Sequence, residues 1–147
     1  MNTTSLLNNL IETLKDGQEG FREAANDVGS PELKSLFREY SDQRARFASE
    51  LQFAAREQGE TRPENTGSMA GAFHRGWINL KSALTKDDKA ILTECERGED
   101  SAVSEFEKAM EERELPIDLA TTIRTQYSQI KAAHNRVRDL RNALAAQ

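Results

Sequence analysis

The residues best placed to do chemistry are polar side chains on helical faces that are otherwise apolar. Apolar residues recur every three or four positions along the chain, which is typical of helices that bury one face. At about 100° per residue, four polar side chains lie about 40° from the centre of such a face. They are Gln18, Arg44, Glu99 and His134. Each falls near the middle of its helix, so antiparallel packing would bring all four to one layer.

The two charged members of this layer should form an ion pair. Burying either charge alone would cost several kcal/mol, so a partner is required. We therefore expect a buried Arg44–Glu99 pair, with Gln18 and His134 completing its hydrogen bonds. Gln43 lies on the flank of its helical face, about 60° from the centre. Partly exposed side chains without special coupling are an alternative, because arginine can extend along a bundle edge towards water.

The same residues allow two other chemistries. A metal or catalytic site would draw its ligands from Glu99, His134, Glu96 and Glu19. Glycines are unfavourable inside helices, so Gly17 and Gly20 indicate either a close helix approach or a gap of ligand size near the layer. In the second case Arg44 could bind a small carboxylate.

Four long helices and one short helix must position these residues. Ser30 and Pro31 are a serine cap followed by a first-turn proline, which together predict the start of the second helix. Thr85, with Asp88 three residues later, is the expected cap of the fourth. Residues 59–67 form a polar loop by composition. The predicted helices span about residues 5–28, 30–58, 68–84, 86–114 and 116 to near the end of the chain.

These lengths favour one all-α domain over residues 1–147, in which two antiparallel hairpins are joined by a long crossover. The crossover, residues 59–85, must return along a helix of about 40 Å, and a short loop plus a short helix can span that length. Residues 87–114 are rich in acids and residues 119–147 in bases, which favours pairing the last two long helices. A five-helix up-and-down bundle is the alternative.

Composition excludes several classes of function. The net charge is −5, which disfavours nucleic acid or an anionic membrane as a partner. Cys95 is the only cysteine, so an intrachain disulfide cannot form, and its position predicts a place in the core. The first residues lack a basic segment and a long apolar run, so we expect a cytoplasmic protein. No phosphate-binding loop, nucleophile elbow or zinc-protease motif occurs.

Particular segments carry a family resemblance. They are KDGQEGFREAA (15–25), FHRGWINLKSAL (73–84), AILTECERGEDSAVSEFEKAM (90–110) and IKAAHNRVRDLR (130–141). Through them the chain resembles, over nearly its whole length, an uncharacterised bacterial family of ferritin-like proteins. The resemblance implies a ferritin-like four-helix bundle. The wider superfamily places a glutamate on each of two helices and Glu-x-x-His on the other two around two metals. This sequence departs from that pattern, with Lys131-x-x-His134 and Gln43-x-x-Arg46.

The expected function is therefore that of a non-enzymatic structural or interaction module, associated with stress and free of metal and cofactor. Ferritin-like bundles often self-associate, so a homodimer or another homo-oligomer is expected. The expected contact is the crossover helix. Trp77 on that helix is expected to pack on the bundle; the alternative is that Met69, Phe73, Trp77 and Leu80 leave an apolar patch for a second subunit. The alternatives are an iron- or manganese-dependent oxidase or storage protein, and a bundle that binds a small carboxylate.

Overall fold

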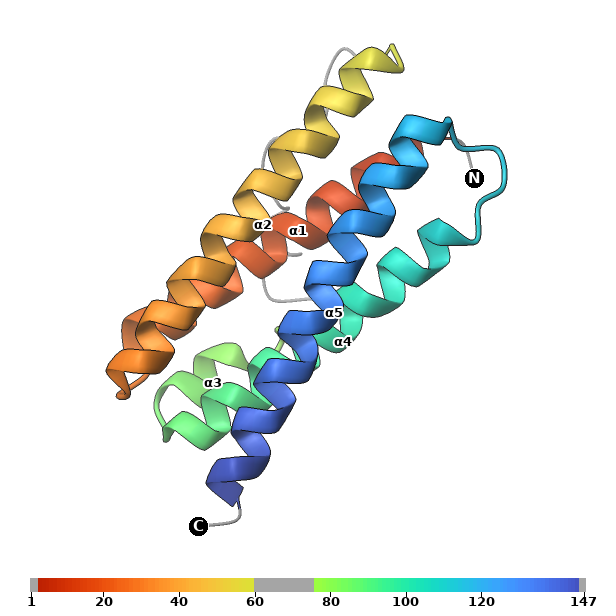
Figure 1. Cartoon of the computed structure of the whole chain (residues 1–147). Coiled ribbons are helices and arrows are strands. Elements are labelled where there is room, and N and C mark those ends of the chain that lie inside the picture. Colours follow the sequence, from red (N-terminus) through yellow and green to blue (C-terminus); the bar gives the residue numbers. More distant parts are fainter. Residues whose placement is uncertain (1–2, 60–75, 146–147) are drawn as a thin grey trace.

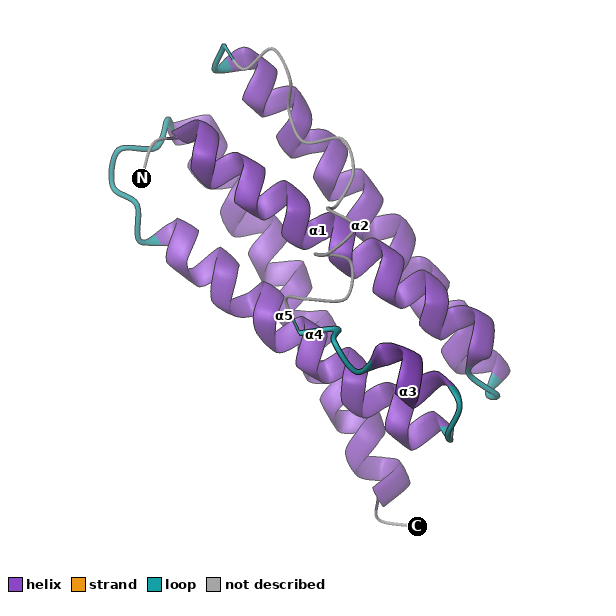
Figure 2. Ribbon diagram, turned by 180° about the vertical axis from the view of Figure 1, so that it is seen from behind, coloured by secondary structure: helices purple, strands orange, loops and turns teal. Residues whose placement is uncertain are grey.

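The structure is a computed structural model that describes residues 3–59 and 76–145. Over this part of the chain it is all-α, with no strand (Figure 2). The helices are α1 (Thr3–Asp27), α2 (Pro31–Glu57), α3 (Leu80–Leu84), α4 (Asp88–Met110) and α5 (Ile117–Ala145). The four long helices therefore lie where the apolar periodicity predicts them.

The turn between α1 and α2 has the predicted cap. Ser30 has extended backbone and its hydroxyl accepts a hydrogen bond from the Leu33 N–H at 3.2 Å, while Pro31 opens the helix. At the other end of α2 the chain leaves through Gly59, whose φ of 90° suits a residue without a Cβ. Both ends of α2 thus follow from local sequence.

Three predicted boundaries are wrong. The helix expected over 68–84 is not continuous, because Gly76 has a φ of 98° and helical structure begins only at Leu80; residues 60–75 lie outside the described part. Thr85 closes α3 by donating its hydroxyl to Ser82 O at 2.8 Å, so it does not cap α4. Asp87 is the cap instead, accepting from the Ala90 N–H at 2.9 Å. Finally, α4 ends at Met110 rather than near residue 114.

Hydrogen bonds between helices fix the direction of each one. The Asp88 carboxylate at the start of α4 accepts from the N–H groups of Gly29 and Ser30, in the turn between α1 and α2. Near the other end of α4, Glu105 accepts from the Asn9 amide at 2.6 Å. Therefore α4 runs antiparallel to α1 and parallel to α2. The start of α4 therefore lies at the opposite end of α2 from Gly59.

The four long helices pack as two antiparallel hairpins, α1 with α2 and α4 with α5 (Figure 1). The α1–α4 contact joins the two hairpins, and α2 touches α5 more sparsely. Tyr127 on α5 donates its hydroxyl to Glu107 on α4 at 2.7 Å, which fixes the register of the second hairpin. The short α3 packs against α4 and α1. With only five residues, it is not a full-length member of an up-and-down bundle.

The apolar core has two parts. One surrounds the first half of α1 and the second half of α2, and it includes Leu10, Leu51 and Phe106. The other surrounds the second half of α1 and the first half of α2, and it includes Phe21 and Phe37. The buried charged residues Arg44 and Glu99 lie at the helix positions between these two clusters.

Candidate functional site: a buried ion pair between two cores

The most distinctive polar contact is an ion pair sealed from water. The side chains of Arg44 on α2 and Glu99 on α4 are 1% and 0% exposed. Arg44 Nη1 donates to Glu99 Oε1 at 2.5 Å, and Nη2 donates to Oε2 at 2.7 Å. This two-pronged geometry is the strongest that a guanidinium and a carboxylate can form.

Neighbouring residues support the guanidinium. On α1, Gly17 lies beside it, where a Cβ would meet Arg44 Nη1 at an ordinary contact distance of 3.4 Å. The Phe21 ring lies 5.3 Å from Arg44 Cζ, within range of a cation–π attraction. On α2, Gln43 accepts from Arg44 Nε at 3.1 Å and donates to Gln129 on α5 at 3.3 Å. All four long helices therefore contribute to this network.

The ion pair limits the chemistry available at the centre. Both oxygens of Glu99 accept short hydrogen bonds from one guanidinium, so neither is available as a metal ligand or a proton acceptor. Arg44 is equally engaged, and its burial leaves no face for an external carboxylate. The geometry is that of a structural contact with its charges satisfied.

Two of the four predicted residues do not join the pair. The Oε1 atom of Gln18 is buried and has no hydrogen-bond partner in the described part of the chain. The Gln18 contact that does form is through its backbone oxygen, which accepts from Ser41 at 2.8 Å. His134 Nε2 lies 2.6 Å from Asp100 Oδ1, on the outer side of α4. The prediction that Gln18 and His134 complete the hydrogen bonds of the pair is therefore wrong, and Gln43 takes that part.

A common cause explains both misplacements. An offset of about 40° from the centre of a helical face is compatible with pointing inward or with lying against the adjacent helix. Gln43, at about 60°, lies further from the centre of its helical face than Gln18, yet its amide oxygen reaches the guanidinium of the next residue. Gln43 could have been identified by its place next to Arg44 in the sequence, because the side-chain oxygen of a glutamine can accept a hydrogen bond from Nε of an adjacent buried arginine.

The alternative metal ligands are also dispersed. Glu19 forms an ion pair with Arg22 on the surface of α1, its side chain 37% exposed. Glu99 is engaged by Arg44. Glu96 and His134 do approach each other, but their third neighbour is Asp100, which is not among the predicted ligands. The four residues Glu99, His134, Glu96 and Glu19 therefore do not form one cluster.

The crossover residues that the structure describes face the core. Trp77 is 2% exposed and Leu80 is 0% exposed, so Trp77 packs on the bundle as predicted, and the alternative of a self-association patch that includes these two residues is wrong. Met69 and Phe73 lie outside the described residues. The Trp77 ring lies over two glycines, because a Cβ would come within 2.5 Å of it at Gly20 and 2.1 Å at Gly98. Gly20 thus marks a close approach, but to an indole ring rather than to another helix.

Cys95 lies in the core, as predicted, with 0% of its surface exposed. Burial raises the pKa of its thiol well above the ordinary range, and the nearby charges of Glu99 and Glu94 raise it further. The thiol therefore stays protonated and unreactive at neutral pH. The pKa of Tyr40 is raised for the same first reason, burial, with Glu99 adding to it.

Fold and site together define an all-α protein whose two apolar cores are separated by a buried, closed ion pair. No helix of the described residues is long and apolar enough to cross a membrane. The chain belongs to the family described as Domain of unknown function (DUF2383), whose model matches residues 2–112. The match includes α1 to α4, and therefore both Arg44 and Glu99. No curated protein matches the chain.

Proposed function

We propose that the chain is a ferritin-like bundle in which an ion pair replaces the central metal site, and that it serves as a non-enzymatic structural or interaction module in stress physiology. The observation that carries the proposal is the bidentate Arg44–Glu99 contact at mid-bundle. The two antiparallel hairpins, with α4 parallel to α2, support the ferritin-like part of the proposal.

The residues at the centre do not fit a pair of metal ions. Such a centre needs a glutamate from each of two helices and Glu-x-x-His from each of the others. Glu99 is bound by Arg44 through both oxygens. Lys131 stands three residues before His134 where a glutamate would be needed, and His134 itself turns to Asp100. A guanidinium at the centre also adds a positive charge that repels any cation.

Iron chemistry tests this proposal directly. Tag-free protein is mixed with ferrous iron in air, and we expect it to oxidise iron no faster than buffer does. The proposal would be contradicted if the wild-type chain bound two irons and accelerated oxidation while Glu99→Gln did neither. Glu19→Gln is the matched control, because this carboxylate lies on the surface of α1.

Self-association is part of the proposal, and its support is the resemblance to ferritin-like proteins. The contact would be an outer face other than Trp77 and Leu80, since both are buried within one chain. Sedimentation equilibrium measures it, with an average mass above that of one 16.5 kDa chain as the expected result. A single-chain mass over the whole accessible concentration range would remove this part of the proposal.

A further inference from the structure

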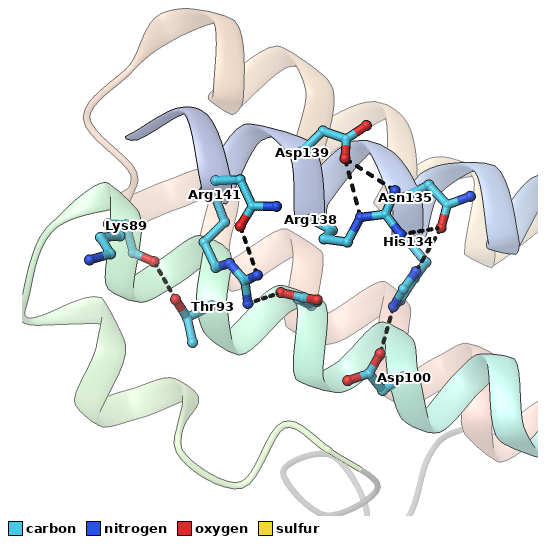
Figure 3. Close-up of polar contacts among 10 residues, drawn as sticks. Lys89, Thr93, Asp100, His134, Asn135, Arg138, Asp139 and Arg141 are labelled. Atoms are coloured by element: carbon cyan, nitrogen blue, oxygen red, sulfur yellow. Dashed lines mark hydrogen bonds and ion pairs between the residues drawn. The ribbon is translucent and has the colours of Figure 1, made fainter. Parts of the chain in front are cut away.

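Three side chains with metal-binding atoms converge where α4 meets α5, outside the central ion pair. Glu96 and Asp100 are four residues apart on α4, so they share one face of the helix, and His134 approaches them from α5. One donor atom from each lies within 4.8 Å of the other two. Figure 3 shows His134 pointing at Asp100 across the gap between the helices.

Hydrogen bonds indicate which nitrogen of His134 carries the proton. Arg138 Nη1 lies 3.4 Å from Asn135 Oδ1, a contact that identifies this atom as an acceptor. The same oxygen lies 3.0 Å from His134 Nδ1, so Nδ1 is the nitrogen that donates (Figure 3). In a neutral imidazole the other nitrogen, Nε2, then presents its lone pair to Asp100 Oδ1 at 2.6 Å.

A lone pair facing a carboxylate oxygen at that distance needs a cation between them. The cation is either a proton on Nε2 or a metal ion. Metal-binding histidines ordinarily donate their other N–H to an oxygen that fixes the ring, which is the part Asn135 plays here. The orientation of His134 is therefore that of a metal ligand with its supporting hydrogen bond already made.

We propose that Glu96, Asp100 and His134 bind one divalent first-row transition ion, with Zn²⁺ as the best match. One imidazole nitrogen and two carboxylate oxygens suit Zn²⁺, and they leave a fourth position for water. Zn²⁺ bonds of about 2.1 Å hold tetrahedral donors about 3.4 Å apart. Asp100 is 62% exposed and can swing outward to reach that spacing, while His134, 12% exposed, stays in place.

The charged groups around the site leave it with one net negative charge. Arg141 forms an ion pair with Glu96 Oε1. The two groups do not have hydrogen-bond geometry, because this oxygen has no hydrogen-bond partner in the described part of the chain, so the attraction between them is that of opposite charges. Arg138 is itself paired with Asp139 at 3.1 Å. With Arg141 set against Glu96, the carboxylate of Asp100 leaves one net negative charge beside the imidazole. This site is separate from Arg44 and Glu99, so it exists whether or not the proposed function is correct.

Metal titration of the full chain tests the site. Tag-free protein, stripped with a chelator, is titrated with Zn²⁺ by calorimetry and with Co²⁺ by visible absorption. We expect one equivalent to bind and Co²⁺ to show bands of low-symmetry N/O coordination. His134→Gln and Asp100→Asn should each weaken binding at least tenfold, and Asn135→Leu, which removes only the supporting oxygen, about tenfold. Zn²⁺ should also raise the melting temperature of the wild type but not of His134→Gln.

Two control variants separate this site from general metal binding. His74→Gln removes the other histidine of the sequence, and Asp139→Asn removes an exposed acid already paired with Arg138. Both should bind as the wild type does, and circular dichroism checks that every variant is folded. No binding to the wild type, or equal binding by the wild type and His134→Gln, would overturn the proposal and leave a protonated His134–Asp100 pair as the account of this contact.

Discussion

At the residue scale, the sequence contains enough information to pair Arg44 with Glu99 but not to complete the network. Opposite charges at equivalent depths of two apolar faces require each other, because either one alone would be too costly to bury. Gln18 and His134 need only hydrogen-bond partners, which several neighbours can supply, so their helical positions did not decide between pointing into the core and lying against the adjacent helix. Asp100 and Asn135 gave no apolar-face signal, since both approach His134 from outside the core.

Cys95 gives a pH-dependent prediction. Because burial raises the pKa of the thiol, the folded chain keeps its proton where the unfolded chain loses it. The free energy of unfolding should therefore fall as pH rises through the ordinary thiol pKa of about 8.5. In Cys95→Ala this component of the slope should vanish, although the cavity lowers stability at every pH. Urea titrations from about pH 7 to about pH 9.5, below the ordinary pKa of tyrosine, measure both slopes. Identical slopes in the two proteins would contradict the assignment.

At the element scale, long helices were predictable because periodicity sums over many residues, whereas short segments were decided by single contacts. The apolar spacing of residues 68–84 favoured a helix, but Gly76 adopts a φ of 98° and the Trp77 ring inserts between α1 and α4. Similarly, Thr85 and Asp87 are both acceptable caps by residue type. Asp87 caps α4 because the Thr85 hydroxyl is already bound to Ser82 O in the last turn of α3.

The position of Trp77 predicts how Gly98 responds to substitution. In Gly98→Ala a Cβ would stand 2.1 Å from the indole, so the ring must move, and we expect a loss of about 1–3 kcal/mol. Trp77 is the only tryptophan, so its fluorescence should shift towards longer wavelength as water reaches it. Gly17→Ala is the matched control, since its Cβ meets the Arg44 side chain at ordinary contact distances from 3.4 Å. A similar emission maximum for both variants and the wild type would show that Trp77 is not held there.

At the scale of the whole molecule, α5 completes cores that the other helices cannot close. The family match ends at residue 112, before α5 begins at Ile117. Yet α5 buries four large apolar side chains: Leu119, Ile123, Ile130 and Val137. Leu119, Ile123 and Ile130 belong to the first apolar cluster and Val137 belongs to the second. The helix α5 therefore spans the polar layer that separates the two clusters.

A chain ending at residue 113 should therefore lose cooperative folding. Removing α5 exposes the apolar residues of α4 that it covers, which should produce an expanded, dye-binding state. Thermal unfolding followed by circular dichroism, together with binding of an apolar dye, measures this. A sharp, cooperative transition with no dye binding would show that α1 to α4 fold without α5.

The central claim is that Arg44 and Glu99 act as one closed unit, and a double-mutant cycle tests it most directly. The variants are Arg44→Met, Glu99→Leu and the two combined, each measured by urea unfolding of the free chain. Each single change strands a buried charge and should cost about 3–5 kcal/mol, whereas the double variant should unfold within about 1 kcal/mol of the wild type. Small single effects that simply add in the double variant would contradict the claim, because they would mean that neither charge depends on the other.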